Sequence, residues 1–136
     1  MINASRSFSA KIAAAVALAL SCTTPALAEP GDLTGNWSGG GAVIYSTGSK
    51  EKARCRAQFN KIGSTSYSMS ATCATASGKV AQSATLRKSG GNSYSGQFRN
   101  PEYNVTGSIR VTVNGNSQNV SMSSEAGSAS FSMSRL

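Results

Sequence analysis

Histidine is absent from this 136-residue sequence, and acidic residues are scarce, with five Asp and Glu in total. Without histidine, the serine-rich segments lack the usual general base of a Ser-His or Cys-His nucleophile. The acidic residues are scattered, and no two are spaced to pair on one strand face as a glycosidase requires. Cysteines without histidine or paired carboxylates also make a poor zinc site. The sequence therefore predicts a protein that is not an enzyme and that uses no metal and no cofactor.

Long apolar runs are also rare. The longest, residues 12–20, is too short to span a bilayer, and the basic residues Arg6 and Lys11 precede it. The sequence Ala-Leu-Ala at 26–28 then places small residues at the −3 and −1 positions of a signal-peptidase site. We therefore expect residues 1–28 to be a cleaved secretory signal peptide, and we find no second stretch that would serve as a transmembrane segment.

Cleavage at this site leaves residues 29–136, which is enough chain for one domain. It removes two of the thirteen basic residues and none of the five acidic ones, so the mature domain carries a net charge of +6. We expect a basic protein that is periplasmic or secreted. A second route stays open, because Ala-Leu-Ser-Cys at 19–22 resembles a lipoprotein cleavage box with Cys22 as the lipidated residue.

The remaining sequence shows no helical periodicity, and apolar and polar residues instead alternate with a period of two between clusters of Gly, Asn and Ser. Short connections of about two to six residues imply antiparallel neighbours, and eight such strands close most simply into an up-and-down barrel. A two-sheet sandwich is the alternative. We expect strands at 33–46, 50–60, 66–76, 79–88, 92–99, 103–113, 117–124 and 128–135.

The inward-facing set predicted by this alternation is rich in Ala and Gly and poor in Leu and Ile. Such small residues suggest a narrow interior that is mostly filled by its own side chains. A ligand carrier needs an open cavity, and the same small residues could leave one, so the sequence does not decide between a filled and a hollow barrel. The positions concerned are Gly39, Gly41, Ala57, Ala71 and Gly96.

Two cysteines, Cys55 and Cys73, remain in the mature domain, and an even number in an exported protein favours a disulfide. If they face each other across an antiparallel hairpin, the apolar alternation of both strands agrees with that register. A thiol activated by the adjacent Arg54 and Arg56 is the alternative, but the alternation points the cysteines inward and the arginines outward. We therefore predict a structural disulfide between Cys55 and Cys73.

The outward face of the 50–60 strand carries basic residues at every second position, at Lys50, Lys52, Arg54 and Arg56, with Lys61 beyond. Such a row suits an anionic partner: lipopolysaccharide, membrane headgroups, an acidic glycan or an acidic protein surface. A merely solvated basic strand is the alternative. No aromatic residues interleave with the row, so we expect no nucleic-acid binding.

The single tryptophan, Trp37, follows Gly35 in the sequence Gly-Asn-Trp at the start of the first expected strand. Arg135 lies near the end of the last expected strand. The first and last strands are neighbours in a closed barrel, so Arg135 is predicted to stack on Trp37 and to plug one end of the barrel. We expect this role to be structural.

The combination of Gly35, Trp37 and Arg135 resembles the calycin superfamily, which comprises lipocalins, avidins and a family of bacterial metalloprotease inhibitors. The resemblance implies a calycin-like barrel. In the inhibitor family the segment before the barrel enters the protease cleft, and 29–33 would be that segment here. Biotin pockets of avidins use several tryptophans, and this chain has one. The chain as a whole also resembles small exported proteins of Gram-negative bacteria whose function is unassigned.

Three functional hypotheses follow from these observations. The preferred one is an exported, non-enzymatic binding module of the cell envelope that contacts an anionic partner or a small ligand. The second is a periplasmic inhibitor of a protease or lysozyme, although a basic protein is poorly suited to a basic lysozyme. The third is an envelope structural protein without a ligand. In each case we expect a monomer.

Overall fold

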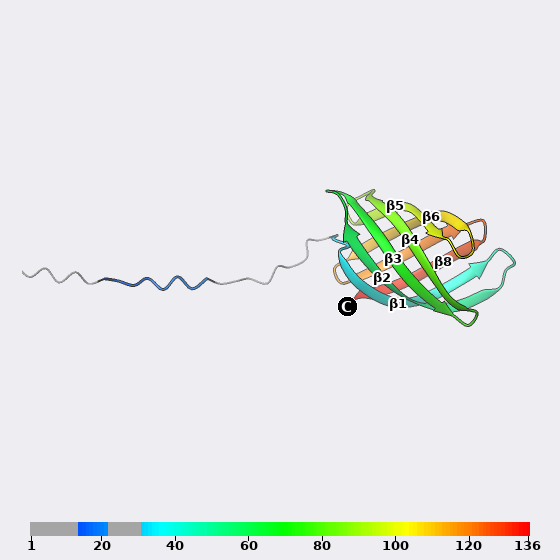
Figure 1. The fold of residues 1–136 in the computed structure, drawn as a ribbon, viewed down its shortest axis with the longest axis horizontal. Helices are drawn as coiled ribbons and strands as arrows, with labels where there is room; N and C mark the ends of the chain where they lie inside the picture. The colour runs from blue at the N-terminus through cyan, green and yellow to red at the C-terminus, as the bar shows by residue number, and fades with distance from the viewer. Residues whose placement is uncertain (1–13, 22–30) are drawn as a thin grey trace, which may run out of the picture.

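The computed structural model describes residues 14–21 and 31–136, and its folded part is a single antiparallel β-barrel (Figure 1). The predicted all-β class is confirmed. Residues 14–21 form neither helix nor strand, and the rest of the expected signal peptide lies outside the described residues, as does Cys22. Within the described ranges, no helix is long and apolar enough to cross a membrane. The strands are β1 (Gly35–Tyr45), β2 (Lys50–Lys61), β3 (Ser66–Thr75), β4 (Gly78–Lys88), β5 (Ser93–Asn100), β6 (Val105–Asn114), β7 (Ser117–Ser124) and β8 (Gly127–Arg135).

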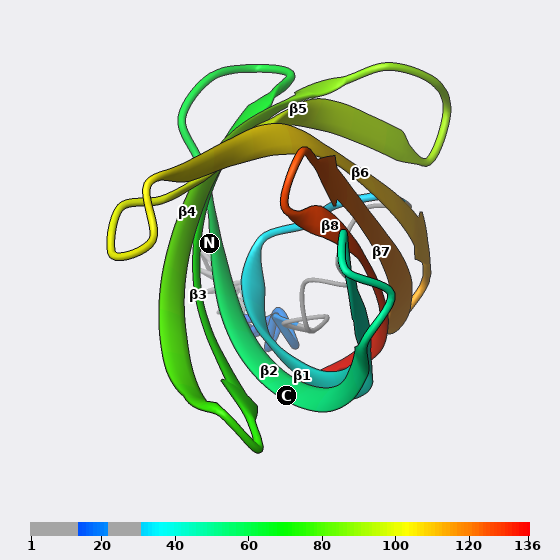
Figure 2. The same cartoon turned by 90° about the vertical axis from the view of Figure 1, so that its right-hand side faces the viewer.

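Each strand pairs with the next one in the chain, and β1 also pairs with β8, so the sheet closes into an up-and-down barrel (Figure 2). The closing pair runs from Trp37 opposite Arg135 to Tyr45 opposite Gly127. Closure leaves every strand with two partners, and no strand edge is exposed for pairing with another chain. The barrel, rather than the sandwich, is therefore the fold of this chain.

The alternation of side chains places an apolar set inside the barrel and a polar set outside. In β2, for example, Ala53, Cys55, Ala57 and Phe59 are buried while the residues between them are exposed. The barrel has two different ends. We call the end that holds the start of β1 and the last residue of β8 the closed end, and the opposite end, formed by the β1–β2, β3–β4, β5–β6 and β7–β8 connections, the mouth.

The inward glycines of β1 reflect close backbone contacts. A Cβ atom built on Gly39 would lie 2.0 Å from the carbonyl oxygen of Ser132, and one on Gly41 would lie 1.8 Å from that of Ser130. Both oxygens belong to the neighbouring strand β8, so any side chain at these positions would collide with backbone. The two glycines therefore allow β1 and β8 to approach each other.

The β5–β6 connection differs from the sequence prediction, which placed Tyr103 inside a strand that starts at residue 103. Tyr103 instead lies in a turn and is 60% exposed. Pro101 has no backbone N–H to donate to a sheet, and Asn104 adopts a left-handed conformation with φ of 52°, which few non-glycine residues accept. These two residues end β5 at Asn100 and delay the start of β6 to Val105.

Candidate functional site

The closed end is covered by residues 31–34, which directly precede β1. Leu33 and Trp37 are fully buried there, and the indole Nε1 of Trp37 donates a hydrogen bond of 2.9 Å to the carbonyl oxygen of Leu33. The guanidinium carbon of Arg135 lies 4.3 Å from the centroid of the Trp37 ring. The structure thus brings Trp37 and Arg135 together, and Gly35 lies beside them with a Cβ position 3.3 Å from Arg135 Nη1.

Two tyrosines hold the same segment from inside the barrel. The hydroxyl of Tyr67 donates a 2.9 Å hydrogen bond to Asp32, and that of Tyr94 donates to the carbonyl oxygen of Gly31. Burial and the hydrogen bond to Asp32 raise the pKa of Tyr67 well above 10. Burial acts to raise the pKa of Asp32, but hydrogen bonds from Thr34 and Tyr67 outweigh it and lower that pKa overall. The closed end is therefore a structural seal held by several hydrogen bonds and the stack of Arg135 on Trp37.

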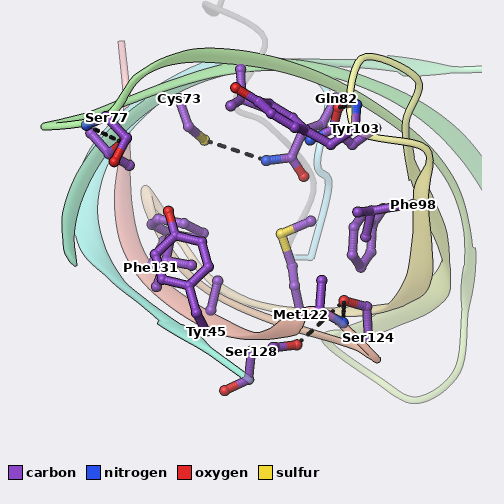
Figure 3. A pocket seen from close by; sticks show the side chains of 18 of the residues that line it. Tyr45, Cys73, Ser77, Gln82, Phe98, Tyr103, Met122, Ser124, Ser128 and Phe131 are labelled. Carbon is purple, nitrogen blue, oxygen red and sulfur yellow. Dashed lines mark hydrogen bonds between the residues drawn. The ribbon is translucent and has the colours of Figure 1, made fainter. Parts of the chain in front are cut away.

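The mouth, in contrast, opens into a cavity of about 440 Å³ that occupies the part of the barrel nearest the mouth (Figure 3). Its walls are mainly apolar and come from all strands except β2. Among the residues that the structure describes, no Asp, Glu, Lys or Arg lines it. Side chains that point into it include those of Val43, Val80, Phe98, Val105, Met122 and Phe131.

This cavity is lined by other residues than the small ones identified in the sequence. None of Gly39, Gly41, Ala57, Ala71 and Gly96 contributes to its wall. A Cβ on Gly96 would lie 1.8 Å from the carbonyl oxygen of Thr85, so this glycine, like those of β1, permits close strand approach. These five residues therefore do not form the cavity that the sequence left open, and the expected filled interior is found only between the cavity and the closed end.

The predicted disulfide between Cys55 and Cys73 is present. The two cysteines are directly opposite each other on β2 and β3, and both are buried. Cys73 also contributes to the inner wall of the cavity, where its Sγ lies 4.0 Å from Nε2 of Gln82 (Figure 3). The disulfide therefore fixes the β2–β3 hairpin, and its Cys73 half forms part of the cavity wall together with Gln82.

A small hydrogen-bonded group ties two mouth connections together. The carboxylate of Glu51 accepts a 2.9 Å hydrogen bond from the Tyr45 hydroxyl and a second one from the Ser77 hydroxyl. The hydrogen bonds from Ser77 and then Tyr45 lower the pKa of Glu51, and the bond to Glu51 raises the pKa of Tyr45. Tyr45 and Ser77 both line the cavity, so this group joins the β1–β2 and β3–β4 connections at its rim.

The structure places the basic row, Lys50, Lys52, Arg54 and Arg56, on the exposed outer face of β2. Flanking residues on β1 and β3 are small, for example Gly40 and Ala74 on the two sides of Arg54. Lys61 does not extend the row. It occupies an odd-numbered position of β2, in the series that faces inward, whereas the row lies on the outward-facing even positions. Its charge lowers the pKa of Asp32 at the closed end.

The outer wall of the barrel carries cations and no carboxylates. The only acidic residue within the eight strands is Glu51, and its carboxylate is bound at the mouth. Strands β4, β5 and β6 add further outward cations. The charged side chains that these strands and the basic row present on the outer wall are therefore all positive. These additional residues are Lys79, Arg87, Arg99 and Arg110.

Comparisons with known proteins show the fold. No protein-family model matches the sequence, and no curated protein shows significant similarity to it. A de novo designed fluorescence-activating β-barrel is similar in structure, with a TM-score of 0.59 and 14% identity over 76% of this chain and 93% of that one. The redesigned barrel mFAP1, solved bound to the small molecule DFHBI, has a TM-score of 0.63 and 10% identity over 76% of this chain and 94% of that one. At such identities the likeness establishes a small, eight-stranded antiparallel barrel.

Proposed function

We propose that this protein is an exported, non-enzymatic binding protein that holds a small, mostly apolar molecule in the mouth of its barrel. The observation that carries the proposal is the cavity of about 440 Å³, which is open at the mouth and ends within the barrel. Ligand pockets for small molecules typically measure about 300–1,000 Å³ and combine apolar walls with a few polar groups. The designed barrel mFAP1, with the same fold, binds a small molecule.

The proposal includes export and a calycin-like relationship. The signal-peptide pattern of residues 1–28 supports export to the periplasm or the medium. The arrangement of Gly35, Trp37 and Arg135 at the closed end supports a calycin-like barrel. Mass spectrometry of the exported protein tests the first point: we expect a chain that starts at Glu29, whereas a lipid on Cys22 would show lipoprotein processing.

Binding is tested with N-phenyl-1-naphthylamine, a neutral probe whose fluorescence rises in apolar surroundings. Ala129 lines the cavity on β8, so Ala129→Phe fills part of the space and should weaken probe binding at least about tenfold. Ala81→Phe is the matched control, because Ala81 points outward on β4 and is exposed. Equal probe affinity in the wild type and in Ala129→Phe, with both proteins folded, would refute the proposal.

A second candidate function is the binding of an acidic glycan of the cell envelope along the basic row. The observation that favours it is the outer wall, on which the strands present cations and no carboxylate. Residues on one face of a strand repeat about every 6.8 Å, so the four cations from Lys50 to Arg56 form a line of about 20 Å. Such a line suits an extended polyanion.

Charge reversal separates this function from general electrostatic attraction. The triple variant Lys52→Glu/Arg54→Glu/Arg56→Glu should elute from immobilised heparin at clearly lower salt than the wild type, with its thermal midpoint nearly unchanged. The control, Arg87→Glu/Arg99→Glu/Arg110→Glu, changes the net charge equally but leaves the row intact. Identical elution of the two variants would show attraction to net charge alone and would remove the row from consideration.

The inhibitor hypothesis finds less support in the geometry. In the related inhibitor family the segment before the barrel enters the protease, which requires that it projects from the barrel. The described part of the corresponding segment, 31–33, is instead bound to the closed end, where Leu33 is fully buried and Arg135 Nη2 donates a 2.8 Å hydrogen bond to the carbonyl oxygen of Asp32. We therefore place binding in the mouth cavity ahead of protease inhibition.

A further inference from the structure

The inner wall of the mouth cavity contains a polar side chain without a conventional hydrogen-bond partner. Gln82 points inward from β4, and the nearest partner of its Nε2 is the sulfur of Cys73 at 4.0 Å. Its Oε1 is enclosed and has no partner. In Figure 3 the amide of Gln82 points into the cavity and is joined to Cys73 by the dashed line. Among the described residues, Gln82, Gln118 and Arg135 have such an unpartnered buried atom, and of these three only Gln82 lines the cavity.

Several other polar groups of the cavity are already bonded. Tyr45 and Ser77 donate to Glu51, and the hydroxyl of Ser124 donates to the carbonyl oxygen of Gly127. The side-chain oxygen of Asn100 accepts from the backbone N–H of Tyr103. These bonds stabilise the turns of the mouth, and among the described residues Gln82 is the polar side chain of the cavity that has an enclosed atom without a partner.

An amide in this situation favours a polar ligand atom. Sulfur is a weak acceptor, and a buried amide group without a partner is less stable than one that is bonded. The last torsion of a glutamine side chain is broad, so the amide can turn either its NH₂ or its carbonyl group toward the cavity. A hydroxyl or N–H group on a ligand would satisfy it in one of these orientations.

The walls limit the charge of the buried part of the ligand. No Asp, Glu, Lys or Arg of residues 31–136 lines the cavity, so an ionised group at its inner end would lose its hydration without gaining a counter-ion from this wall. Phe98, Met122 and Phe131 instead offer two aromatic rings and a thioether to an apolar body. The uncharged wall of the cavity and the position of Gln82 thus favour a neutral molecule with one polar end.

We propose that the ligand is a compact, neutral ring compound with a single hydroxyl or N–H group, and that this group binds to the amide of Gln82 with the ring among Phe98, Met122 and Phe131. This inference rests on the proposed function, because it names the class of molecule that the mouth cavity takes. A molecule of the same shape without the polar group would cover the amide and leave it unbonded, and would bind more weakly.

The inference is tested with 2-naphthol and 2-methylnaphthalene, which share a ring system and differ in one substituent. Their dissociation constants are measured by calorimetry for the wild type, for Gln82→Leu and for Gln97→Leu. The last is the matched control, because Gln97 is exposed on the outside of β5. We expect the preference for 2-naphthol over 2-methylnaphthalene to fall about threefold to tenfold in Gln82→Leu, as one net hydrogen bond requires, and to stay unchanged in Gln97→Leu.

The outcomes separate this inference from the proposed function. If neither compound binds the wild type, the proposed function fails and this inference fails with it. If both bind and the preference is the same in Gln82→Leu as in the wild type, the cavity takes apolar molecules and the role of Gln82 is overturned. Thermal unfolding of both variants establishes that each is folded at the temperature of the titration.

Discussion

Arg135, in the last strand, lies over the ring of Trp37, in the first strand, with 4.3 Å between its guanidinium carbon and the ring centroid. Its two terminal nitrogens donate hydrogen bonds to the carbonyl oxygens of Thr34 and Asp32. One side chain thus joins both ends of the barrel sequence to the segment that covers the closed end. The planar guanidinium is suited to this position, because it stacks on a ring and donates several bonds at once.

Removal of this cation should destabilise the whole barrel. A cation–π contact contributes about 0.5–2 kcal/mol, and hydrogen bonds from a charged group contribute about 1.5–3 kcal/mol. We therefore expect Arg135→Met to lower the free energy of unfolding by about 2–4 kcal/mol in urea titrations. Arg99→Met is the control, because Arg99 is an exposed outward residue of β5. Similar stabilities of the two variants would show that the stack over Trp37 contributes little.

The disulfide should contribute comparably to stability. Cys55 and Cys73 are 18 residues apart, and closing a loop of this size stabilises a protein by roughly 3 kcal/mol in the chain-entropy model. We expect Cys55→Ala/Cys73→Ala to unfold at correspondingly lower urea concentration, and treatment of the wild type with a reductant to reproduce most of the loss. Thiol titration of the mature protein should find both cysteines oxidised, and a free thiol at either one would contradict the disulfide.

Two adjacent glycines offer a sharp test of strand packing. A Cβ on Gly41 would lie 1.8 Å from the carbonyl oxygen of Ser130, whereas one on Gly40 would have its nearest contact at 3.4 Å, the carbonyl oxygen of Ala53. We expect Gly41→Ala to lower the free energy of unfolding by about 3 kcal/mol, the upper end of the usual cost of overpacking, because the backbone beside it has little freedom to move. Gly40→Ala should change it by less than about 1 kcal/mol. Equal effects of the two substitutions in thermal unfolding would contradict the close approach of β1 and β8.

Much of the fold is predictable from the sequence because a strand has a fixed period of two. The alternation places Cys55 and Cys73 on one face, and only one hairpin register brings them together. The chain order of a closed barrel likewise makes the first and last strands neighbours, which puts Arg135 opposite Trp37. The first relationship follows from the two-residue alternation of a strand, and the second from the order of the strands along the chain. Neither depends on how side chains fill the interior.

The cavity depends on that filling, so its walls cannot be identified from the sequence alone. Parity identifies Gly39 and Gly41 as inward residues, but it does not reveal that the backbone of β8 occupies the space beside them. The cavity lies nearer the mouth, where the inward residues of several strands leave the centre of the barrel empty. One signal was present in the sequence: Gln82 is a polar residue in an inward apolar series with Val80, Ala84 and Leu86.

The hydrogen bonds at the rim make the mouth sensitive to acid. Glu51 has a pKa below its ordinary 4.5 because Ser77 and Tyr45 donate to its carboxylate, so its contribution to stability is present above pH 4.5 and is lost as the pH falls through the lowered value. We expect Glu51→Gln to have a lower thermal midpoint than the wild type at pH 6, and this difference to shrink as the pH is lowered toward 3.

The hydrogen bonds of Glu51 also join the β1–β2 and β3–β4 connections at the mouth. N-phenyl-1-naphthylamine should therefore dissociate faster from Glu51→Gln than from the wild type at pH 6. Glu125→Gln, in the exposed β7–β8 turn, is the control that removes one carboxylate from the same end of the barrel. A difference between wild type and Glu51→Gln that stays constant from pH 6 to pH 3 would show that the carboxylate does not hold the rim.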